Sequence, residues 1–251
     1  MPQDPNTIPF AAFATVLALV PVVALWWLWI LRGMEARRLT RFALALLAWC
    51  GFVTAFGFSQ PLEHTRFLPL LAGPLVIPPA AAILWFAFRG PASVFRALPL
   101  ASLTLMQVFR LPLELFGLHG LYLGGVMPRL MTYEGGNLDI LIGLSAPLVA
   151  TLIATNDLSI PRLRRIVIAW NIGGLMMLGN VVLRGVFSIP SSAQLWAFDT
   201  PNLAVTTFPF AYIPGLFVMS ALAGDVFSLR ALLRTAPAPS RLGELRVSGC
   251  G

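Results

Sequence analysis

Long apolar runs separated by short polar segments dominate the pattern along this chain. Each run contains roughly 20 residues, the length that an α-helix needs to cross about 30 Å of hydrocarbon. Proline and glycine interrupt several runs, which membrane helices tolerate where neighbouring groups or water satisfy the freed carbonyls. The pattern predicts an all-α, polytopic transmembrane bundle of seven helices, at about residues 10–31, 40–58, 67–88, 97–123, 138–155, 165–188 and 206–229.

The positions of the basic residues predict how this bundle is oriented. All 17 basic residues are arginines, because the sequence contains no lysine. Cytoplasmic segments of membrane proteins carry an excess of basic residues. Alternate connecting segments hold 13 arginines against 2, and the richer ones are residues 32–41, 89–96, 156–165 and 230–251. This asymmetry predicts a multi-pass protein of the bacterial cytoplasmic (inner) membrane with its N-terminus out and its C-terminus in.

The composition agrees with a membrane protein that has no soluble domain. Hydrophobic residues make up 58% and charged residues 11% of the chain, and the mean hydropathy is +0.83. The spans use most of the length, so we expect one transmembrane domain over residues 1–235 and a disordered cytoplasmic tail over 236–251. The net charge of +7 is distributed around the membrane ends, which predicts contact with membrane lipids and no nucleic-acid partner.

The fourth span carries the strongest internal polarity. Gln107, Arg110 and Glu114 lie on one side of a regular helix, and Arg110 and Glu114 are close enough to pair. A charged residue near the bilayer centre costs at least about 2.5–3.5 kcal/mol, so it usually faces the bundle interior and has a partner. The segment predicts either a polar pocket or ion path, or a neutralised pair that only fastens this span to a neighbour.

Other polar residues are expected toward the outer ends of the later spans. Asn180 and Arg184 share one face of the sixth span. Arg184, like Arg110, lies inside a span, where the excess of arginines in cytoplasmic segments does not explain it. Further polar residues lie where the chain enters the fifth span and just before the seventh span. With the polar residues of the fourth and sixth spans they make up a candidate ligand-binding or proton site: Gln107, Arg110, Glu114, Glu134, Asn137, Asp139, Asn180, Arg184, Asp199 and Asn202. The alternative for the loop members is ordinary: solvated turns and caps, with Asp139 at the start of the fifth span.

Several known chemistries are excluded or unsupported. A retinal Schiff base needs a lysine, and there is none. Haem or a metal would have to use His64 or His119, and no ligand spacing supports either histidine. We therefore predict no cofactor and no metal, and we assign no catalytic residue.

Three segments of the chain resemble a group of uncharacterised bacterial multi-pass membrane proteins of similar length. The segments are Phe109–Glu114, Met131–Pro147 and Ala197–Asn202, and the resemblance covers roughly residues 97–235. It implies a helical membrane fold of about seven spans and brings no assigned activity. Most of the candidate site residues lie inside these segments.

These observations favour a binding protein over an enzyme. The leading hypothesis is an outward-facing polar pocket that binds a small solute, ion or lipid in a transporter or sensor. Arg110 would be the anchor for an anion or carboxylate, and Glu114 its partner or a proton site. The second is a non-catalytic subunit or assembly factor of a membrane complex, held to a protein partner, whose polar residues only set helix packing. The third is a membrane-embedded enzyme with Glu114 or Asp199 as general base.

Overall fold

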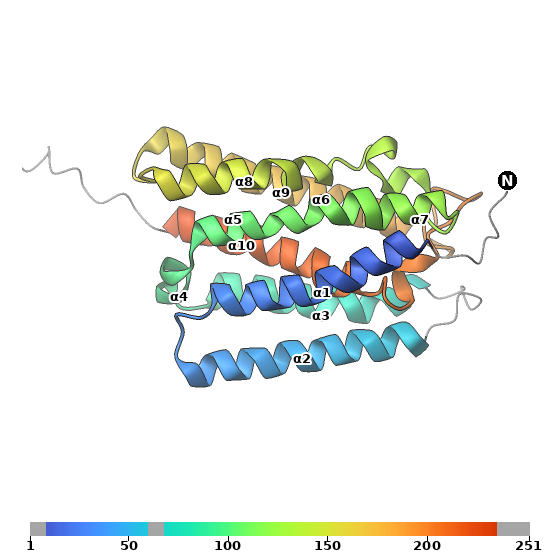
Figure 1. Ribbon diagram of the computed structural model, residues 1–251, viewed down its shortest axis with the longest axis horizontal. Helices are drawn as coiled ribbons and strands as arrows, with labels where there is room; N and C mark the ends of the chain where they lie inside the picture. The colour runs from blue at the N-terminus through green and yellow to red at the C-terminus, as the bar shows by residue number, and fades with distance from the viewer. Residues whose placement is uncertain (1–8, 60–67, 235–251) are drawn as a thin grey trace, which may run out of the picture.

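The computed structural model describes residues 9–59 and 68–234, and every regular element in these ranges is helical. The longer helices are α1 (Phe10–Ile30), α2 (Ala36–Ser59), α3 (Leu68–Arg89), α8 (Asp139–Thr155), α9 (Pro161–Phe187) and α10 (Val218–Arg234). They lie side by side with roughly parallel axes (Figure 1), with α2 along one edge and α8 and α9 along the opposite edge. The all-α prediction is confirmed, while the predicted tail 236–251 and His64 lie outside the described residues.

Four segments are long and apolar enough to cross a membrane as single continuous helices. They are α1, α2, α9 and Ile213–Leu233, and they match four of the predicted spans. The last begins later than predicted because residues 204–206 form a 3-10 turn and residues 207–211 are not helical. Gly73–Arg89 and α8 are shorter apolar helices.

The outward faces of the bundle are apolar. Leu47, Phe88 and Leu148, on three different helices, are 69%, 70% and 73% exposed. A soluble helix bundle keeps polar residues on such faces. Together with the four long apolar helices, these faces identify a helical membrane protein.

The predicted fourth span is a helix of changing geometry, here called the interrupted helix (residues 100–123). It is made of α5 (Leu100–Met106), the 3-10 turn η2 (Gln107–Phe109), α6 (Arg110–Pro112), the π-helix η3 (Leu113–Leu118) and α7 (His119–Leu123). Pro112 lacks the N–H that a regular helix would use here. Single π turns inside helices are frequent at functional sites. This π turn contains Glu114.

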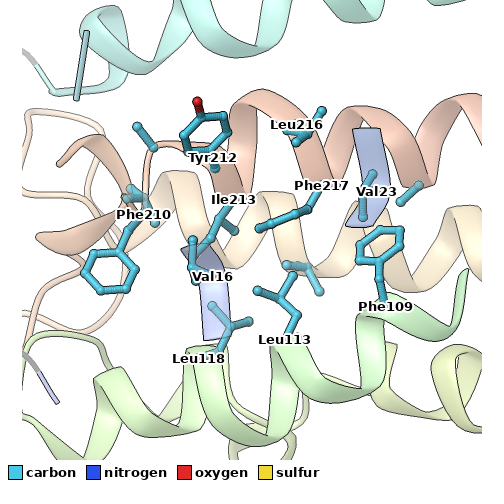
Figure 2. Packing of buried hydrophobic residues seen from close by; sticks show 14 of the residues in the cluster. Val16, Val23, Phe109, Leu113, Leu118, Phe210, Tyr212, Ile213, Leu216 and Phe217 are labelled. Atoms are coloured by element: carbon cyan, nitrogen blue, oxygen red, sulfur yellow. The ribbon is translucent and has the colours of Figure 1, made fainter. Parts of the chain in front are cut away.

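One face of the interrupted helix packs into the apolar core. Phe109, Leu113 and Leu118 meet Val16 of α1 and Phe217 near the start of α10 (Figure 2). The rings of Phe109 and Phe217 lie 5.7 Å apart, and Leu118 and Val16 are almost fully buried. This packing holds the helix in place, so its opposite face presents polar side chains to α8 and α10.

Helix α8 approaches the interrupted helix closely through a glycine. A Cβ at Gly143 would lie 2.6 Å from the backbone nitrogen of Leu111, closer than real Cβ contacts allow. Small residues at helix interfaces let membrane helices pack backbone to backbone. The close approach brings the first turn of α8, with Asp139, against Arg110.

Candidate functional site: a buried arginine–carboxylate network

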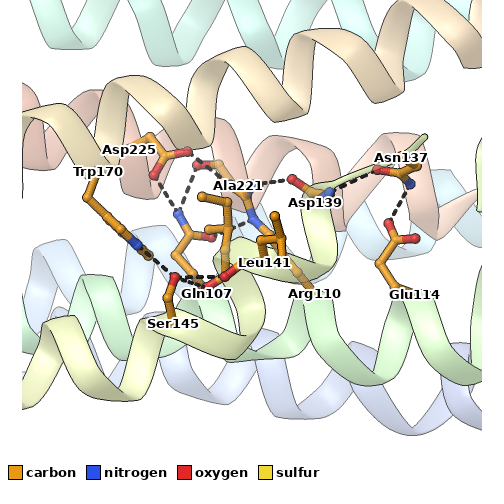
Figure 3. A network of polar contacts seen from close by, with 11 residues as sticks. Gln107, Arg110, Glu114, Asn137, Asp139, Leu141, Ser145, Trp170, Ala221 and Asp225 are labelled. Carbon is orange, nitrogen blue, oxygen red and sulfur yellow. Dashed lines mark hydrogen bonds and ion pairs between the residues drawn. The ribbon is translucent and has the colours of Figure 1, made fainter. Parts of the chain in front are cut away.

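Arg110 lies at the centre of a closed set of polar side chains. Its Nη1 donates to Asp139 Oδ1 at 2.5 Å, its Nη2 to Asp225 Oδ2 at 2.9 Å and its Nε to Gln107 Oε1 at 3.2 Å (Figure 3). Arg110 and Gln107 are each 1% exposed and Asp225 is fully buried. We call these four residues the Arg110 network. It joins the interrupted helix, α8 and α10.

Gln107 ties the network to α10 a second time. Its Nε2 donates to Asp225 Oδ1 at 3.0 Å and to the carbonyl of Ala221 at 3.2 Å. Asp225 therefore accepts from both Arg110 and Gln107, one on each carboxylate oxygen. Every nitrogen of the guanidinium and the amide nitrogen of Gln107 has a partner, as buried polar groups require.

Two glycines leave room for the network. A Cβ at Gly174 of α9 would lie 2.7 Å from Asp225 Oδ2, and a Cβ at Gly224 of α10 would lie 2.7 Å from Gln107 Nε2. No other residue type fits at either position without displacing a buried polar group. Helix α9 thus forms a wall of the site without contributing a charge.

Glu114 extends the polar set beyond Arg110. Its Oε1 accepts from Asn137 Nδ2 at 2.8 Å, and its Oε2 is buried with no hydrogen-bond partner among the described residues. Asn137 also donates to the carbonyl of Met131 at 2.9 Å and accepts from the backbone N–H of Asp139 at 3.1 Å. Asn137 therefore links Glu114 to the start of α8.

The charges in this region do not balance. One guanidinium faces the carboxylates of Asp139 and Asp225, and Glu114 adds a third carboxylate one link further along. Full ionisation would leave two uncompensated negative charges in a group whose members are at most 6% exposed. Burying an unpaired charge costs several kcal/mol.

Arg184 and Asn180 form a second, separate cluster around the loop before α8. Arg184 Nη1 donates to the carbonyls of Leu130 at 3.0 Å and Gly135 at 2.6 Å, and its Nε to Asn180 Oδ1 at 2.8 Å. Asn180 in turn donates to the carbonyl of Gly136 at 3.2 Å. Gly136 has φ +94°, a conformation that favours glycine, and the guanidinium packs against it. This cluster shapes the loop that carries Asn137.

The remaining predicted site residues lie outside the Arg110 network. Glu134 is half-exposed, 3.7 Å from Arg129 Nε and 3.9 Å from His119 Nε2. Asp199 is exposed and borders a shallow cavity together with Arg129. Asn202 is buried and donates to the carbonyl of Gly185 at 3.4 Å. These residues shape the end of the bundle where α7 ends and α8 begins.

The predicted Arg110–Glu114 pair is wrong. Among the described residues no ion pair joins them, because Asp139 and Asp225 occupy both Nη atoms of Arg110. The change to 3-10 and then π geometry between Gln107 and Leu118 also alters the spacing of a regular helix. Arg110 is buried among helices, not exposed in an open pocket.

Sequence reasoning missed Asp225, which makes the second ion pair with Arg110. The prediction named polar residues toward the outer ends of the later spans and named no acid within the span 206–229, where Asp225 lies. The signal was present, because Asp225 is an acidic residue inside an apolar span. Such residues usually have a buried partner.

In the two described ranges no group of three or more His, Cys, Asp or Glu side chains is arranged to hold a metal ion. His119 packs against the ring of Tyr133, with centroids 4.9 Å apart, and is 3.9 Å from Glu134. Haem ligation by His64 concerns a residue outside those ranges.

Comparisons of the chain with protein-family models, with curated proteins and with solved structures found no match. The resemblance to uncharacterised bacterial membrane proteins therefore stays a prediction. The class of the molecule comes from its own helices, since four of them have the length and hydropathy of membrane spans.

Proposed function

We propose that this chain is a seven-span protein of the bacterial cytoplasmic membrane, N-terminus out and C-terminus in, and that the Arg110 network with Glu114 binds a proton in a proton-linked transporter or sensor. The distribution of arginines supports the orientation. The alignment of α3, α8 and the interrupted helix with the four long apolar helices supports the span count (Figure 1).

The observation that carries the proton site is Glu114. It is 1% exposed, and among the described residues it has no ion-pair partner and its Oε2 has no hydrogen-bond partner. An ionised carboxylate in such a place is far more costly than a neutral one, and buried carboxyl groups usually take up a proton instead. Glu114 therefore holds the proton that brings the group closer to charge balance.

The other two carboxylates have better reasons to stay ionised. Asp139 and Asp225 each accept a charge-assisted hydrogen bond from Arg110. Asp139 is also the first residue of α8, where the N-terminal backbone N–H groups favour an anion. The environments thus separate one proton-holding acid from two salt-bridged ones.

Loss of the proton from Glu114 has a structural consequence. The new charge on Oε2 would need water, a cation or a moved donor, because no described group supplies one. Asn137 connects Glu114 to Asp139 and to the loop before α8, so any adjustment reaches the end of the bundle. Binding or release of a proton at Glu114 can therefore shift the equilibrium between two conformations of the end of the bundle that contains the loop before α8.

A pH jump on the purified chain tests this proposal. On a change from mildly acidic to mildly alkaline solution, we expect the unaltered chain to release one more proton than the Glu114→Gln variant, measured with an indicator dye. Glu35→Gln is the matched control, because Glu35 is 63% exposed and lies beside Arg38, outside the buried polar group. Equal release from the unaltered chain and Glu114→Gln would contradict the proposal.

A second function, a non-catalytic subunit of a membrane complex, is favoured by a different observation. All three guanidinium nitrogens of Arg110 are satisfied within the chain, and the network joins three helices. A network whose donors are all satisfied in this way is compatible with a purely structural role, in which it only sets how the helices pack. In that case neutral replacement of the whole network would preserve assembly with the partner.

A further inference from the structure

We propose that a cavity beside Arg184 binds the phosphate of an anionic membrane phospholipid. This site is separate from the Arg110 network and does not depend on its function. It stands on three features: the uncompensated charge of Arg184, the cavity next to it, and the exposed apolar side chains that line the cavity.

The charge of Arg184 has no counterion in the part of the chain that the structure describes. Its hydrogen-bond acceptors are two backbone carbonyls and the side-chain oxygen of Asn180, all neutral. No ion pair involves it among the described residues, and Nη2 donates no hydrogen bond there. Arg184 is therefore held rigidly by Nε and Nη1 while Nη2 remains available to an anion.

A half-open cavity of about 390 Å³ lies at this guanidinium. It is lined by Leu130, Asn180, Leu183, Arg184 and Trp196. The volume is within the range of small-molecule sites, about 300–1,000 Å³. Arg184 and Asn180 provide its polar wall, and leucine and tryptophan provide the rest.

Two of the residues that line the cavity have exposed apolar side chains. Leu183 is 54% exposed and Trp196 is 43% exposed, with the Trp196 ring packed edge-on against Phe187 at 5.5 Å. Leu195 and Phe198, in the same non-helical segment, are 58% and 69% exposed. Tryptophan beside the end of an apolar helix is typical of the headgroup level of a bilayer.

This combination fits a phospholipid better than a soluble anion. A guanidinium forms strong, directional hydrogen bonds to phosphate oxygens. Leu183 and Trp196 would contact the glycerol and the upper acyl chains, which a free phosphate lacks. Arg184 is in the last turn of α9, a helix long and apolar enough to span a membrane, and the phosphates of a bilayer lie at the level where such helices end.

The test adds a negative charge to the cavity without removing any hydrogen bond of Arg184. Leu183→Glu places a carboxylate in the cavity, and Leu183→Gln is its neutral control of the same shape. Binding of phosphatidylglycerol, glycerol phosphate and inorganic phosphate to the purified chain is measured by native mass spectrometry. We expect the most tightly bound phosphatidylglycerol molecule to have about tenfold lower affinity for Leu183→Glu than for Leu183→Gln, because the added carboxylate repels the phosphate of the ligand.

Equal phosphatidylglycerol affinity of the unaltered chain, Leu183→Glu and Leu183→Gln would overturn the proposal. If inorganic phosphate at equal concentration displaces the lipid, the cavity binds phosphate, but its ligand is a soluble phosphate and the assignment to a lipid is wrong. The pair Trp196→Glu and Trp196→Gln repeats the comparison from the opposite wall, in a non-helical segment, should Leu183→Glu fail to fold.

Discussion

Replacing Arg110 by methionine is expected to lower the free energy of unfolding by about 3–5 kcal/mol, the cost of removing one partner from a buried ion pair. Asp139 and Asp225 would both remain in the bundle without a cation, and Gln107 would lose its donor. Solvent offers these carboxylates little hydration in exchange, because Asp225 is fully buried and Asp139 is 6% exposed. Reversible unfolding in mixed micelles, followed by circular dichroism, measures the change.

A neutral version of the same network separates lost charge balance from lost packing. The triple variant Arg110→Met, Asp139→Asn, Asp225→Leu removes all three charges, and replacing a buried ionic group by well-packed residues is often neutral. We expect it to recover most of the stability lost in Arg110→Met. A single Arg110→Met variant as stable as the unaltered chain would show that the ion pairs do not hold the helices together.

Gly174→Ala is expected to destabilise the fold by about 1–3 kcal/mol, the usual cost of overpacking a core. The new methyl group would lie 2.7 Å from Asp225 Oδ2. The carboxylate cannot move away without stretching its bonds to Arg110 and Gln107. The same unfolding measurement detects the loss, and we expect the pH-dependent proton release to change as well.

The neighbouring glycine supplies the control. A Cβ at Gly173 meets nothing within 4 Å, so Gly173→Ala should leave stability unchanged or raise it by up to about 1 kcal/mol through helix propensity. The two substitutions differ by one position on α9. Similar stabilities for both variants would show that α9 does not pack tightly against the network.

The membrane class and the importance of Arg110 could be predicted from the sequence. Apolar runs of spanning length produce α1, α2 and α9 almost at the predicted positions, because hydropathy depends on local composition. Arg110 stood out since a charge inside an apolar run needs a partner. Asn137, Asp139 and Glu114 were also predicted as site residues, and they lie together beside Arg110.

The partners of Arg110 could not be predicted in the same way. Pairing with Glu114 assumed a regular helix, in which residues four apart differ by about 40°. The chain instead changes to 3-10 and π geometry around Pro112. Asp225 is 115 positions away in sequence, so its contact depends on how α10 packs, which hydropathy does not determine. Arg184 likewise binds backbone carbonyls of a distant loop and not an acid.

The central claim is that the Arg110 network with Glu114 holds a proton at neutral pH. The most direct measurement is the infrared spectrum of the purified chain, in which the C=O stretch of a protonated carboxyl group is separate from the carboxylate bands. We expect this band at neutral pH in the unaltered chain and in Glu35→Gln, and its loss in Glu114→Gln. A spectrum of the unaltered chain without a protonated carboxyl band, or an unchanged band in Glu114→Gln, would contradict the claim.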